Sequence, residues 1–510
     1  MSPHPSPLPQ GRGEGITRDK KGSIRMEIPV WLIPDRRKSP AVRGGKRKSP
    51  ERRSSPRFTV HLPVKVRVKD LEKNISTSIK GKIVNLNESG VDLILEKPLN
   101  GSPRLSLNIE STYDALNRAI PVELMWTAPK TKKREFLYGF KFLKLDIEQL
   151  FTLKKLLYLN DNFIIEQANR IIRLIADPAN AEKVKRFFIK ELKDYLAKLV
   201  SLEREIHQTG PTKSGQIKLN RLNDEILKKA DKLEGIVGSS IILKEIKRRF
   251  RLIVGGFVYQ SLIVKRANDK PLGYPGDYEL LEAIYNNQPV SEKIGHYFDK
   301  SFLSNKYAVA VRKRKEKMKV ILSEFISRSS SPIVRILNLA CGSCREIKEL
   351  LSASSVYKKR IIFEFVDQDG DALEFAKDSL GKLPTNIEIK FSKENILDIV
   401  NKPSYYSRLI GKQDLVYSIG LADYLPDRIL KKLIRFCFGL LSPGGKLIIT
   451  HKDIDKYKPL HPDWFCDWAF IPRNREKLSN LIKDSRIDNF SIDLEWDDSK
   501  IIFFTIIGKT

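Results

Sequence analysis

Two neighbouring segments of the chain place small residues and a carboxylate where a nucleoside ligand could bind. Residues 335–347, RILNLACGSCREI, read as a hydrophobic strand, a small-residue turn around Gly342 and the start of a helix. Residues 364–376, EFVDQDGDALEFA, contain another hydrophobic strand, which ends on Asp367. In an open parallel sheet, such a turn lets the backbone approach the ligand, and a carboxylate at the end of the next strand accepts hydrogen bonds from ribose hydroxyls. The offset between Gly342 and Asp367 is close to the roughly 20 residues expected for that role.

The turn lacks the GxGxxG pattern of dinucleotide sites and resembles the first motif of the class I S-adenosylmethionine (SAM) methyltransferases. In that motif the usual acidic residue is replaced here by Asn338, and the first and third glycines by Ala340 and Cys344. Losing the acid removes a partner for the methionine ammonium of SAM. The resemblance implies SAM as cofactor and a Rossmann-like α/β domain. It implies cofactor contacts at Asn338, Ala340, Gly342, Asp367, Gln368, Asn395 and Ser418.

Other features of the C-terminal third fit the same class. We expect Asp369 to cap the helix after Asp367, and Asn395 to stand where such enzymes contact adenine. The segment LSPGGKLIIT at 441–450 is the glycine turn and fifth strand common in the class, and the strands at 491–496 and 501–508 should complete the sheet as an antiparallel hairpin. Cys341 and Cys344 also form a CxxC pair. No second pair stands at ligand spacing, so we expect no metal.

A narrower resemblance covers roughly residues 265–510. It rests on four unusual stretches, KPLGYPGDYELLEAIY, AVRKRKEKM, YSIGLADYLPDR and DWAFIPRNREKL. They are similar to enzymes associated with making 3-hydroxypalmitate methyl ester, a hydroxy-fatty-acid signal of bacteria. The resemblance implies carboxyl O-methylation of a fatty acid or similar small acid.

That reaction indicates which side chains to look for. A carboxylate is already ionised at neutral pH, so no general base is needed. The enzyme must align the reacting atoms and exclude water, with aromatic faces near the sulfonium and an arginine fork on the carboxylate. The candidates for carboxylate binding are Arg312, Arg314 and Arg473, and those for aromatic walls are Tyr278, Tyr424 and Trp468. Tyr274 and Asp277 belong to a glycine-containing loop that could close over SAM. For each residue alone, packing in the core or solvation at the surface stays the competing interpretation.

A second ligand-binding pattern lies near the N-terminus. From Arg57 to about residue 147, six short alternating strands separated by turn residues predict a small antiparallel barrel. Arg53-Ser-Ser-Pro-Arg57 precedes the first strand, and Asn85-Leu-Asn87-Glu-Ser-Gly90 follows about thirty residues later. Together they resemble the PilZ domain, the receptor module for cyclic di-GMP. Two arginine forks suit the guanine edges and phosphates of this dinucleotide. The resemblance implies ligand contacts at Arg53, Arg57, Asn85, Asn87 and Gly90, although Asn87 stands where the family usually has serine.

The chain therefore divides into four predicted parts. These are a disordered basic tail (1–50), a PilZ-like six-stranded antiparallel barrel (51–160), a helical connector or substrate cap (161–330) and a methyltransferase domain (331–510). The tail lacks the apolar core of a signal peptide, and Met26 is an alternative start. The apolar run 252–264 is too short to span a membrane and predicts a buried helix.

The composition narrows the function classes. Lys and Arg number 93 against 62 Asp and Glu, which gives a net charge of +31. Such a charge is compatible with peripheral contact with anionic membrane or with nucleic acid, but no nucleic-acid recognition module accompanies it. Four cysteines without a disulfide pattern favour the cytoplasm. We expect a cyclic di-GMP-responsive methyltransferase of the bacterial cytoplasm; the alternatives are an RNA or protein methyltransferase and a non-catalytic cyclic di-GMP effector.

Overall fold

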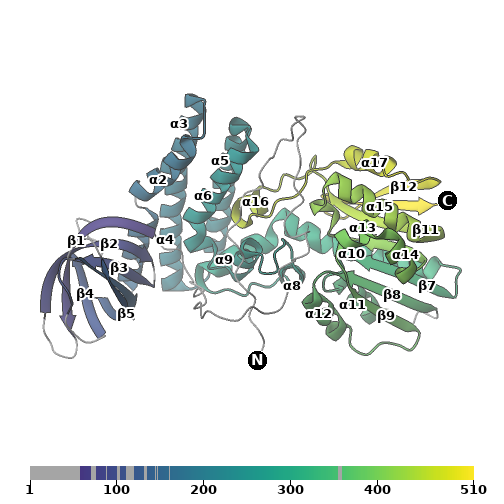
Figure 1. Cartoon of the computed structure of the whole chain (residues 1–510), viewed down its shortest axis with the longest axis horizontal. Coiled ribbons are helices and arrows are strands. Elements are labelled where there is room, and N and C mark those ends of the chain that lie inside the picture. The colour runs from purple at the N-terminus through teal and green to yellow at the C-terminus, as the bar shows by residue number, and fades with distance from the viewer. Residues whose placement is uncertain are drawn as a thin grey trace.

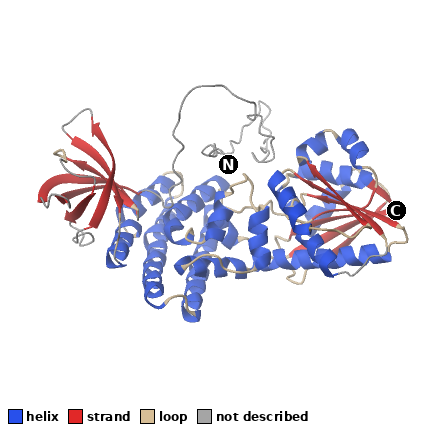
Figure 2. Ribbon diagram, turned by 90° about the horizontal axis from the view of Figure 1, so that it is seen from below, coloured by secondary structure: helices blue, strands red, loops and turns tan. Residues whose placement is uncertain are grey.

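The computed structural model describes residues 58–70, 76–87, 89–99, 104–110, 120–130, 135–143, 145, 147–159, 161–353 and 359–510. A barrel lies at one end of an elongated molecule, helices fill the middle, and a sheet covered by helices lies at the other end (Figures 1 and 2). Arg53 and Arg57 fall outside the described residues, as does the side chain of Asn87.

Within the described residues, six strands close into an antiparallel barrel in the order β1-β2-β3-β6-β5-β4. The alternation of apolar and polar residues along the strands favours this barrel, because every second side chain of a strand points inward. Val66, Ile83 and Leu93 are fully buried inside. The strands are β1 (Phe58–Asp70), β2 (Ser76–Asn87), β3 (Gly90–Leu95), β4 (Arg104–Glu110), β5 (Ile120–Lys130) and β6 (Glu135–Phe142).

The middle of the chain is helical from residue 147 to residue 328 apart from short loops. The apolar run 252–264 contributes to two helices, and Ile253, Val254 and Phe257 are buried, as predicted. The elements are α1 (Ile147–Tyr158), α2 (Asp161–Ile172), α3 (Pro178–Arg186), the π-helical η3 (Phe187–Leu192), α4 (Lys193–Thr209), α5 (Lys213–Val237), α6 (Ser240–Val258), α7 (Leu262–Asp269), α8 (Tyr278–Asn286), α9 (Lys293–Ser304) and α10 (Lys306–Arg328).

The C-terminal part is a seven-stranded sheet in the order β12-β13-β11-β10-β7-β8-β9. Strands β7 to β11 run parallel, and β12 and β13 form the predicted antiparallel hairpin. The strands are β7 (Ile333–Leu339), β8 (Arg360–Asp367), β9 (Ile387–Lys393), β10 (Gln413–Ser418), β11 (Leu441–Lys452), β12 (Phe490–Trp496) and β13 (Ile502–Lys509). The helical elements are α11 (Arg345–Ala353), α12 (Gly370–Leu380), α13 (Ile396–Asn401), α14 (Pro403–Ile410), η4 (Ala422–Tyr424), α15 (Asp427–Leu440), α16 (Leu460–Cys466) and α17 (Arg475–Lys483).

Helices cover both faces of this sheet (Figure 2). Along β7, Val334 and Ile336 join one hydrophobic cluster, while Leu337 and Leu339 join the other. A strand covered on both faces needs apolar residues at successive positions rather than in alternation, which explains the continuous apolar run in the sequence. No helix among the described residues is long and apolar enough to cross a membrane.

Candidate functional site

The strand order reverses between β7 and β10, so the chain leaves opposite sides of the sheet there. In open α/β sheets, ligands bind outside the carboxyl ends of the strands at such a point. The Ser418 hydroxyl donates to the Leu339 carbonyl at 2.7 Å, tying the two strand ends together. Ser418 was predicted to contact the cofactor, and its hydroxyl is therefore already engaged in a hydrogen bond within the wall of the crevice.

The predicted glycine turn and ribose carboxylate meet directly. The Gly342 N–H donates to Asp367 Oδ2 at 2.9 Å, and the Asp369 N–H donates to Oδ1 at 3.0 Å. Asp367 is only 8% exposed. Burial raises the pKa of this carboxyl to about 6, although the backbone N–H groups act in the opposite direction. The carboxylate is thus fixed in orientation at the end of β8.

The turn keeps the backbone conformation that glycine favours, although two of the motif's glycines are replaced by other residues. Ala340 and Cys344 adopt positive φ angles of 54° and 50°, and Gly342 one of 54°. A non-glycine residue in this region is strained, and such strain gathers at functional sites. A Cβ at Gly342 would meet nothing within 4 Å, so the turn faces open space there. The turn can therefore receive a ligand close to its backbone.

Asn338 is held in a buried polar network that the sequence did not reveal. Its Nδ2 donates to Glu346 Oε1 at 3.1 Å and approaches the Tyr417 hydroxyl at 2.9 Å, and that hydroxyl donates to the same Glu346 oxygen at 2.8 Å. Burial raises the pKa of Glu346. Asn338 Oδ1 has no hydrogen-bond partner among the described residues. A carboxyl group from the first turn of α11 thus stands beside the position where the motif usually has its own acid.

The ends of β8 and β9 bring two more predicted residues together. Asn395 Nδ2 donates to Gln368 Oε1 at 2.8 Å, while Asn395 Oδ1 accepts from the Leu397 N–H and caps α13. Asp369 caps α12 through the Asp371 N–H, as predicted. The Tyr274 hydroxyl donates to Asp369 Oδ2 at 3.0 Å, across 95 residues of sequence. The loop carrying Tyr274 therefore reaches the carboxylate end of the crevice.

The neighbouring residues of that loop have structural tasks. Asp277 caps α8 by accepting from the Leu280 N–H at 2.9 Å, and it also accepts from Arg266 Nε at 2.9 Å. Its Oδ1 thus serves the protein interior, and the predicted cofactor contact of Asp277 stays a prediction. The Tyr278 ring lies 5.3 Å from the Phe375 ring of α12, which joins the start of α8 to the domain beyond the crevice.

The three arginines predicted to bind a carboxylate differ in how far their N–H groups are already engaged within the protein. Arg473 uses all five N–H groups inside the protein, on Asp427, His451 and two backbone carbonyls. Arg312 donates to the carbonyls of Ile284 and Leu303. Arg473 thus has all five N–H groups engaged within the protein. Arg312 uses its Nη1 to join two helices, and its predicted role in binding a carboxylate stays a prediction.

Arg314 is different. It is buried, and its Nε has no hydrogen-bond partner within the part of the chain that the structure describes. Its guanidinium lies against Gly420, whose Cβ position would be 3.6 Å from both Nη atoms. Gly420 lies two residues after the end of β10, so Arg314 extends from α10 to the carboxyl edge of the sheet.

Four aromatic rings pack against one another beside Arg314, and we call this cluster the aromatic chamber: Tyr307, Tyr424, Trp468 and Phe470. Trp468 Nε1 donates to the Tyr424 hydroxyl at 2.6 Å. The Tyr307 ring lies 5.6 Å from Trp468 and 4.8 Å from Phe470. Gly276 covers the chamber, since its Cβ would lie 3.0 Å from Trp468 Cζ2. The predicted walls Tyr424 and Trp468 therefore do lie together, under the loop of Tyr274.

A buried lysine at the end of β11 joins this chamber and was missed from the sequence. Lys452 Nζ lies 3.1 Å from the centroid of the Phe470 ring and has no hydrogen-bond partner among the described residues. Burial lowers the pKa of Lys452 to about 7. The signal available was its position, directly after the apolar run KLIIT and His451, where parallel strands present ligand-binding residues.

Asp423 supplies the negative charge next to that lysine. Its Oδ1 accepts from the Lys452 backbone N–H at 3.0 Å and lies 3.3 Å from His451 Nδ1. Burial alone would raise the pKa of Asp423, but His451 and Lys452 hold it below its ordinary value. Arg473 can only donate to His451 Nε2, which places the proton of the neutral ring on Nδ1.

The described part of the barrel contains some of the residues predicted to bind cyclic di-GMP. Asn85 Nδ2 donates to Asp92 Oδ2 at 2.9 Å, and the β2–β3 register shifts beside Asn85. Such bulges redirect side chains at binding sites. At Gly90 a Cβ would lie 2.2 Å from the Phe140 carbonyl oxygen, so β6 requires glycine there. Strand β1 begins at Phe58, opposite Leu86 and next to Asn85 in register.

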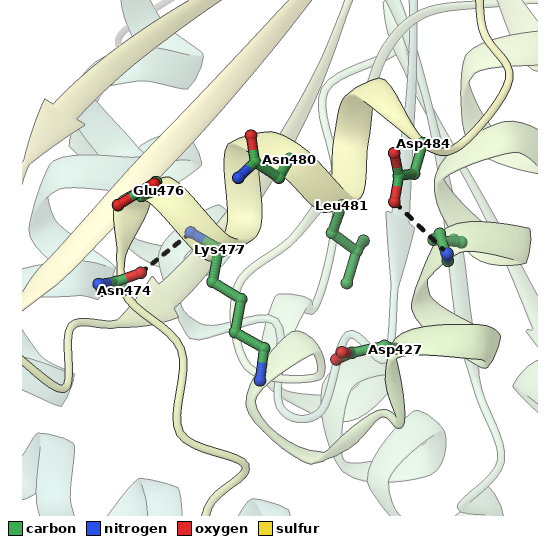
Figure 3. Close-up of a pocket in the computed structure, with 8 residues that line it drawn as sticks. Asp427, Asn474, Glu476, Lys477, Asn480, Leu481 and Asp484 are labelled. Carbon is green, nitrogen blue, oxygen red and sulfur yellow. Dashed lines mark hydrogen bonds and ion pairs between the residues drawn. The ribbon is translucent and has the colours of Figure 1, made fainter.

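An open pocket of about 500 Å³ lies elsewhere, between α15 and α17 (Figure 3). Its lining carries charges of both signs, and it includes Asp427, the partner of Arg473. None of the strand ends that form the crevice contributes to it. We therefore place the candidate site at the crevice and the aromatic chamber.

Comparisons with known proteins identify one domain. Residues 51–159 match the family model of the PilZ domain, so the chain carries a PilZ domain formed by the barrel and α1. A search of curated proteins by sequence finds no match.

The solved structures similar to this chain include methyltransferases. A possible exported protein from Bordetella parapertussis is 16% identical at a TM-score of 0.36 and covers 62% of this chain and 96% of its own. Magnesium protoporphyrin IX methyltransferase from Synechocystis with bound SAM is 11% identical at 0.32, covering 49% and 97%. An O-methyltransferase family protein from Burkholderia thailandensis is 14% identical at 0.30, covering 54% and 74%. At these TM-scores the likenesses carry no weight for function, which rests on the geometry of the site.

Proposed function

We propose that this protein is a SAM-dependent methyltransferase whose activity responds to cyclic di-GMP. The observation that carries the proposal is the hydrogen bond from the Gly342 N–H to Asp367 at the strand-order reversal. It joins an open backbone turn to an oriented carboxylate, the pair that a nucleoside requires. Asn395 and Gln368 at the next strand end suit the adenine edge.

The residues present also fit the methionine end of SAM. Glu346 offers the carboxyl group that Asn338 lacks, and a bound ammonium would favour its ionised form. The orphaned Oδ1 of Asn338 is a second acceptor for that ammonium. When bound, SAM supplies an electrophilic methyl group on a sulfonium. The non-catalytic alternative, which depended on the missing acid, thereby loses its main support.

The acceptor that we propose is a carboxylate, in a hydroxy fatty acid or a similar small acid. Arg314 supports this choice, because a buried guanidinium with an unused N–H at the crevice suits a carboxylate. In the reaction a carboxylate oxygen would attack the methyl carbon. A C–O bond forms as the C–S bond breaks, and no proton has to be removed. The chain's own task is to bind, align and exclude water, for which the aromatic chamber is suited.

Regulation is proposed to begin at the barrel, with cyclic di-GMP bound by Arg53, Arg57 and Asn85. Helix α1 follows the barrel directly and is anchored in the helical region. Lys154 Nζ pairs with Glu203 Oε1 at 2.5 Å, with both side chains buried. The Tyr158 ring lies 4.7 Å from Phe257 of α6.

From α6 the contacts continue to the methyltransferase domain. Arg251 Nη2 pairs with Asp467 Oδ1 at 2.7 Å, and Lys247 Nζ with Asp463 Oδ2 at 2.5 Å. Asp467 immediately precedes Trp468 of the aromatic chamber. A displacement of α1 therefore has a packed route to the site, provided that the nucleotide binds the two arrangements with different affinity.

The test measures methyl transfer from labelled SAM to lipid extract, with and without cyclic di-GMP, for the wild type and for Arg57→Ala. We expect alkali-labile label in the organic phase, a change in rate with nucleotide, and loss of that change in Arg57→Ala with unchanged SAM affinity. Lys80→Ala, an exposed change in β2, is the matched control. Unchanged turnover and SAM affinity in the wild type would refute regulation. Label in RNA or protein instead would refute the acceptor.

A further inference from the structure

The most unusual charge in the molecule is Lys452, which our account of SAM binding does not use. A buried ammonium without a hydrogen-bond acceptor is unfavourable, and substitution by an apolar residue of similar volume usually stabilises such a site. Lys452 is 1% exposed, and its Nζ has no acceptor in the described part of the chain. Its place between Phe470 and Tyr307 offers partial compensation through the ring faces. The presence of a group that destabilises the folded protein is explained if this group binds a ligand.

The charges around Lys452 indicate which kind of ligand. Arg314 and Lys452 bring two cations toward the chamber, and each has an N–H-bearing atom without an acceptor among the described residues. Asp423 brings one anion, and its Oδ1 is already engaged by the Lys452 backbone N–H. Asp463 lies near Lys452 as well, but its charge is balanced by Lys247, whose Nζ lies 2.5 Å from Asp463 Oδ2. With Asp463 and Lys247 counted as a pair, one positive charge is left over, which complements a single negative charge on the ligand. The two cations also share neighbours, because Tyr307 and Asp423 interact electrostatically with Arg314, and Lys452 lies near both.

We propose that Lys452 binds the anionic oxygen of the methyl acceptor and so selects a carboxylate over the corresponding neutral head group. This inference rests on the proposed function and assigns the acceptor end of the same site to a residue that no motif marked. The aromatic chamber then encloses the head group, with the loop through Gly276 as its cover. Lys452 acts here by its charge; a lysine acting as general base would instead serve a hydroxyl or amine acceptor.

The charge role and the general-base role of Lys452 predict opposite dependences on pH. Burial lowers the pKa of Lys452 to about 7. A charge role predicts that acceptor affinity falls as pH rises from 7 to 9, because the amine loses its proton while the carboxylate stays ionised. A base role predicts a rate that rises over the same range. The other groups that face Lys452 are Asp423 after β10, Asp463 on α16, Arg314 and Tyr307 on α10, Tyr424 of η4 and the adjoining His451. The pKa values of His451 and Asp423 are shifted down and those of the tyrosines up, which moves these groups away from this range. Burial raises the pKa of Asp463, so the Lys452→Met variant shows which part of the pH dependence belongs to the lysine.

The test compares 3-hydroxypalmitate with its uncharged amide, at saturating SAM, in the wild type, Lys452→Met and Lys446→Met. Lys446 is exposed near the start of the same strand and serves as the matched control. We expect Lys452→Met to weaken carboxylate binding by at least about 10-fold, to lose preference over the amide and to lose the pH dependence. SAM affinity should be unchanged and the melting temperature equal or higher.

Carboxylate binding by Lys452→Met that equals the wild type would overturn the inference. So would a lowered melting temperature together with weakened SAM binding, which would give the lysine a structural role, or a failure of the wild type to prefer the carboxylate. Absence of SAM binding in the wild type is a separate result, and it would contradict the proposed function itself.

Discussion

The Gly342 N–H and the Asp367 carboxylate lie 2.9 Å apart, although 25 residues separate them in the chain. The bond fixes the turn after β7 against the end of β8. Asp367 Oδ1 accepts from the Asp369 N–H, and the backbone N–H of Gln368 also stabilises the carboxylate. A carboxylate oxygen accepts more than one hydrogen bond, so Asp367 can hold the turn and receive ribose hydroxyls at once.

Removing this carboxylate should weaken nucleoside recognition. We expect Asp367→Ala to weaken SAM binding by at least about 10-fold, because hydrogen bonds to a charged group contribute about 1.5–3 kcal/mol. Titration calorimetry with SAM measures the change. Asp378→Ala, on the exposed face of α12, is the control and should bind as the wild type does. Equal affinity in Asp367→Ala and the wild type would place SAM elsewhere.

The pKa of the same residue predicts a pH dependence. Burial raises the pKa of Asp367 to about 6 from an ordinary 3.8. The folded protein therefore binds this proton more tightly than the unfolded chain does, and this group's contribution to stability falls as pH rises from about 4 to about 6. SAM binding has the opposite sign, since ribose hydroxyls donate to the ionised form. We expect affinity about 10-fold weaker at pH 5 than well above pH 6, and a flat profile for Asp367→Asn.

Much of the fold and the centre of the site could be predicted from local patterns. The turn at Gly342, the strand ending on Asp367 and the cap at Asp369 each depend on residues near one another in sequence. Arg473 could not be interpreted in this way, because its partners Asp427 and His451 come from other segments of the chain. An arginine that binds substrate and one that ties Asp427 to His451 are the same residue type. Lys452 carried no motif, and only its place at a strand end pointed to it.

Arg314 and Arg473 are both buried, but they should respond differently to substitution. Arg473→Gln removes donors from two buried carbonyls, and each unsatisfied group costs about 1–3 kcal/mol. We expect a clearly lower melting temperature. Arg314→Gln should impair turnover more than stability, because its Nε has no partner among the described residues. Thermal melts and initial rates on both variants make the comparison. A pair of variants equally unstable would assign Arg314 a structural role as well.

The contact between α1 and α6 should carry the response to the nucleotide. A Cβ at Gly256 would lie 1.5 Å from the Tyr158 hydroxyl, so Gly256→Ala must displace the Tyr158 ring, through which α1 contacts α6. We expect a loss of about 1–3 kcal/mol of stability from overpacking and a weakened effect of cyclic di-GMP on turnover, with SAM affinity retained. Gly235→Ala on α5 is the matched control, since nothing lies within 4 Å of its Cβ position. A full nucleotide response in Gly256→Ala would rule out this route.

The most direct test of the account is SAM binding and methyl transfer by the purified protein, measured with and without cyclic di-GMP. We predict that wild-type protein binds SAM, that Asp367→Ala binds it at least about 10-fold more weakly, and that transfer of label to a carboxylate acceptor changes when the nucleotide is added. Failure of the wild type to bind SAM under either condition would contradict the methyltransferase assignment and leave the C-terminal domain as a scaffold beside a PilZ domain.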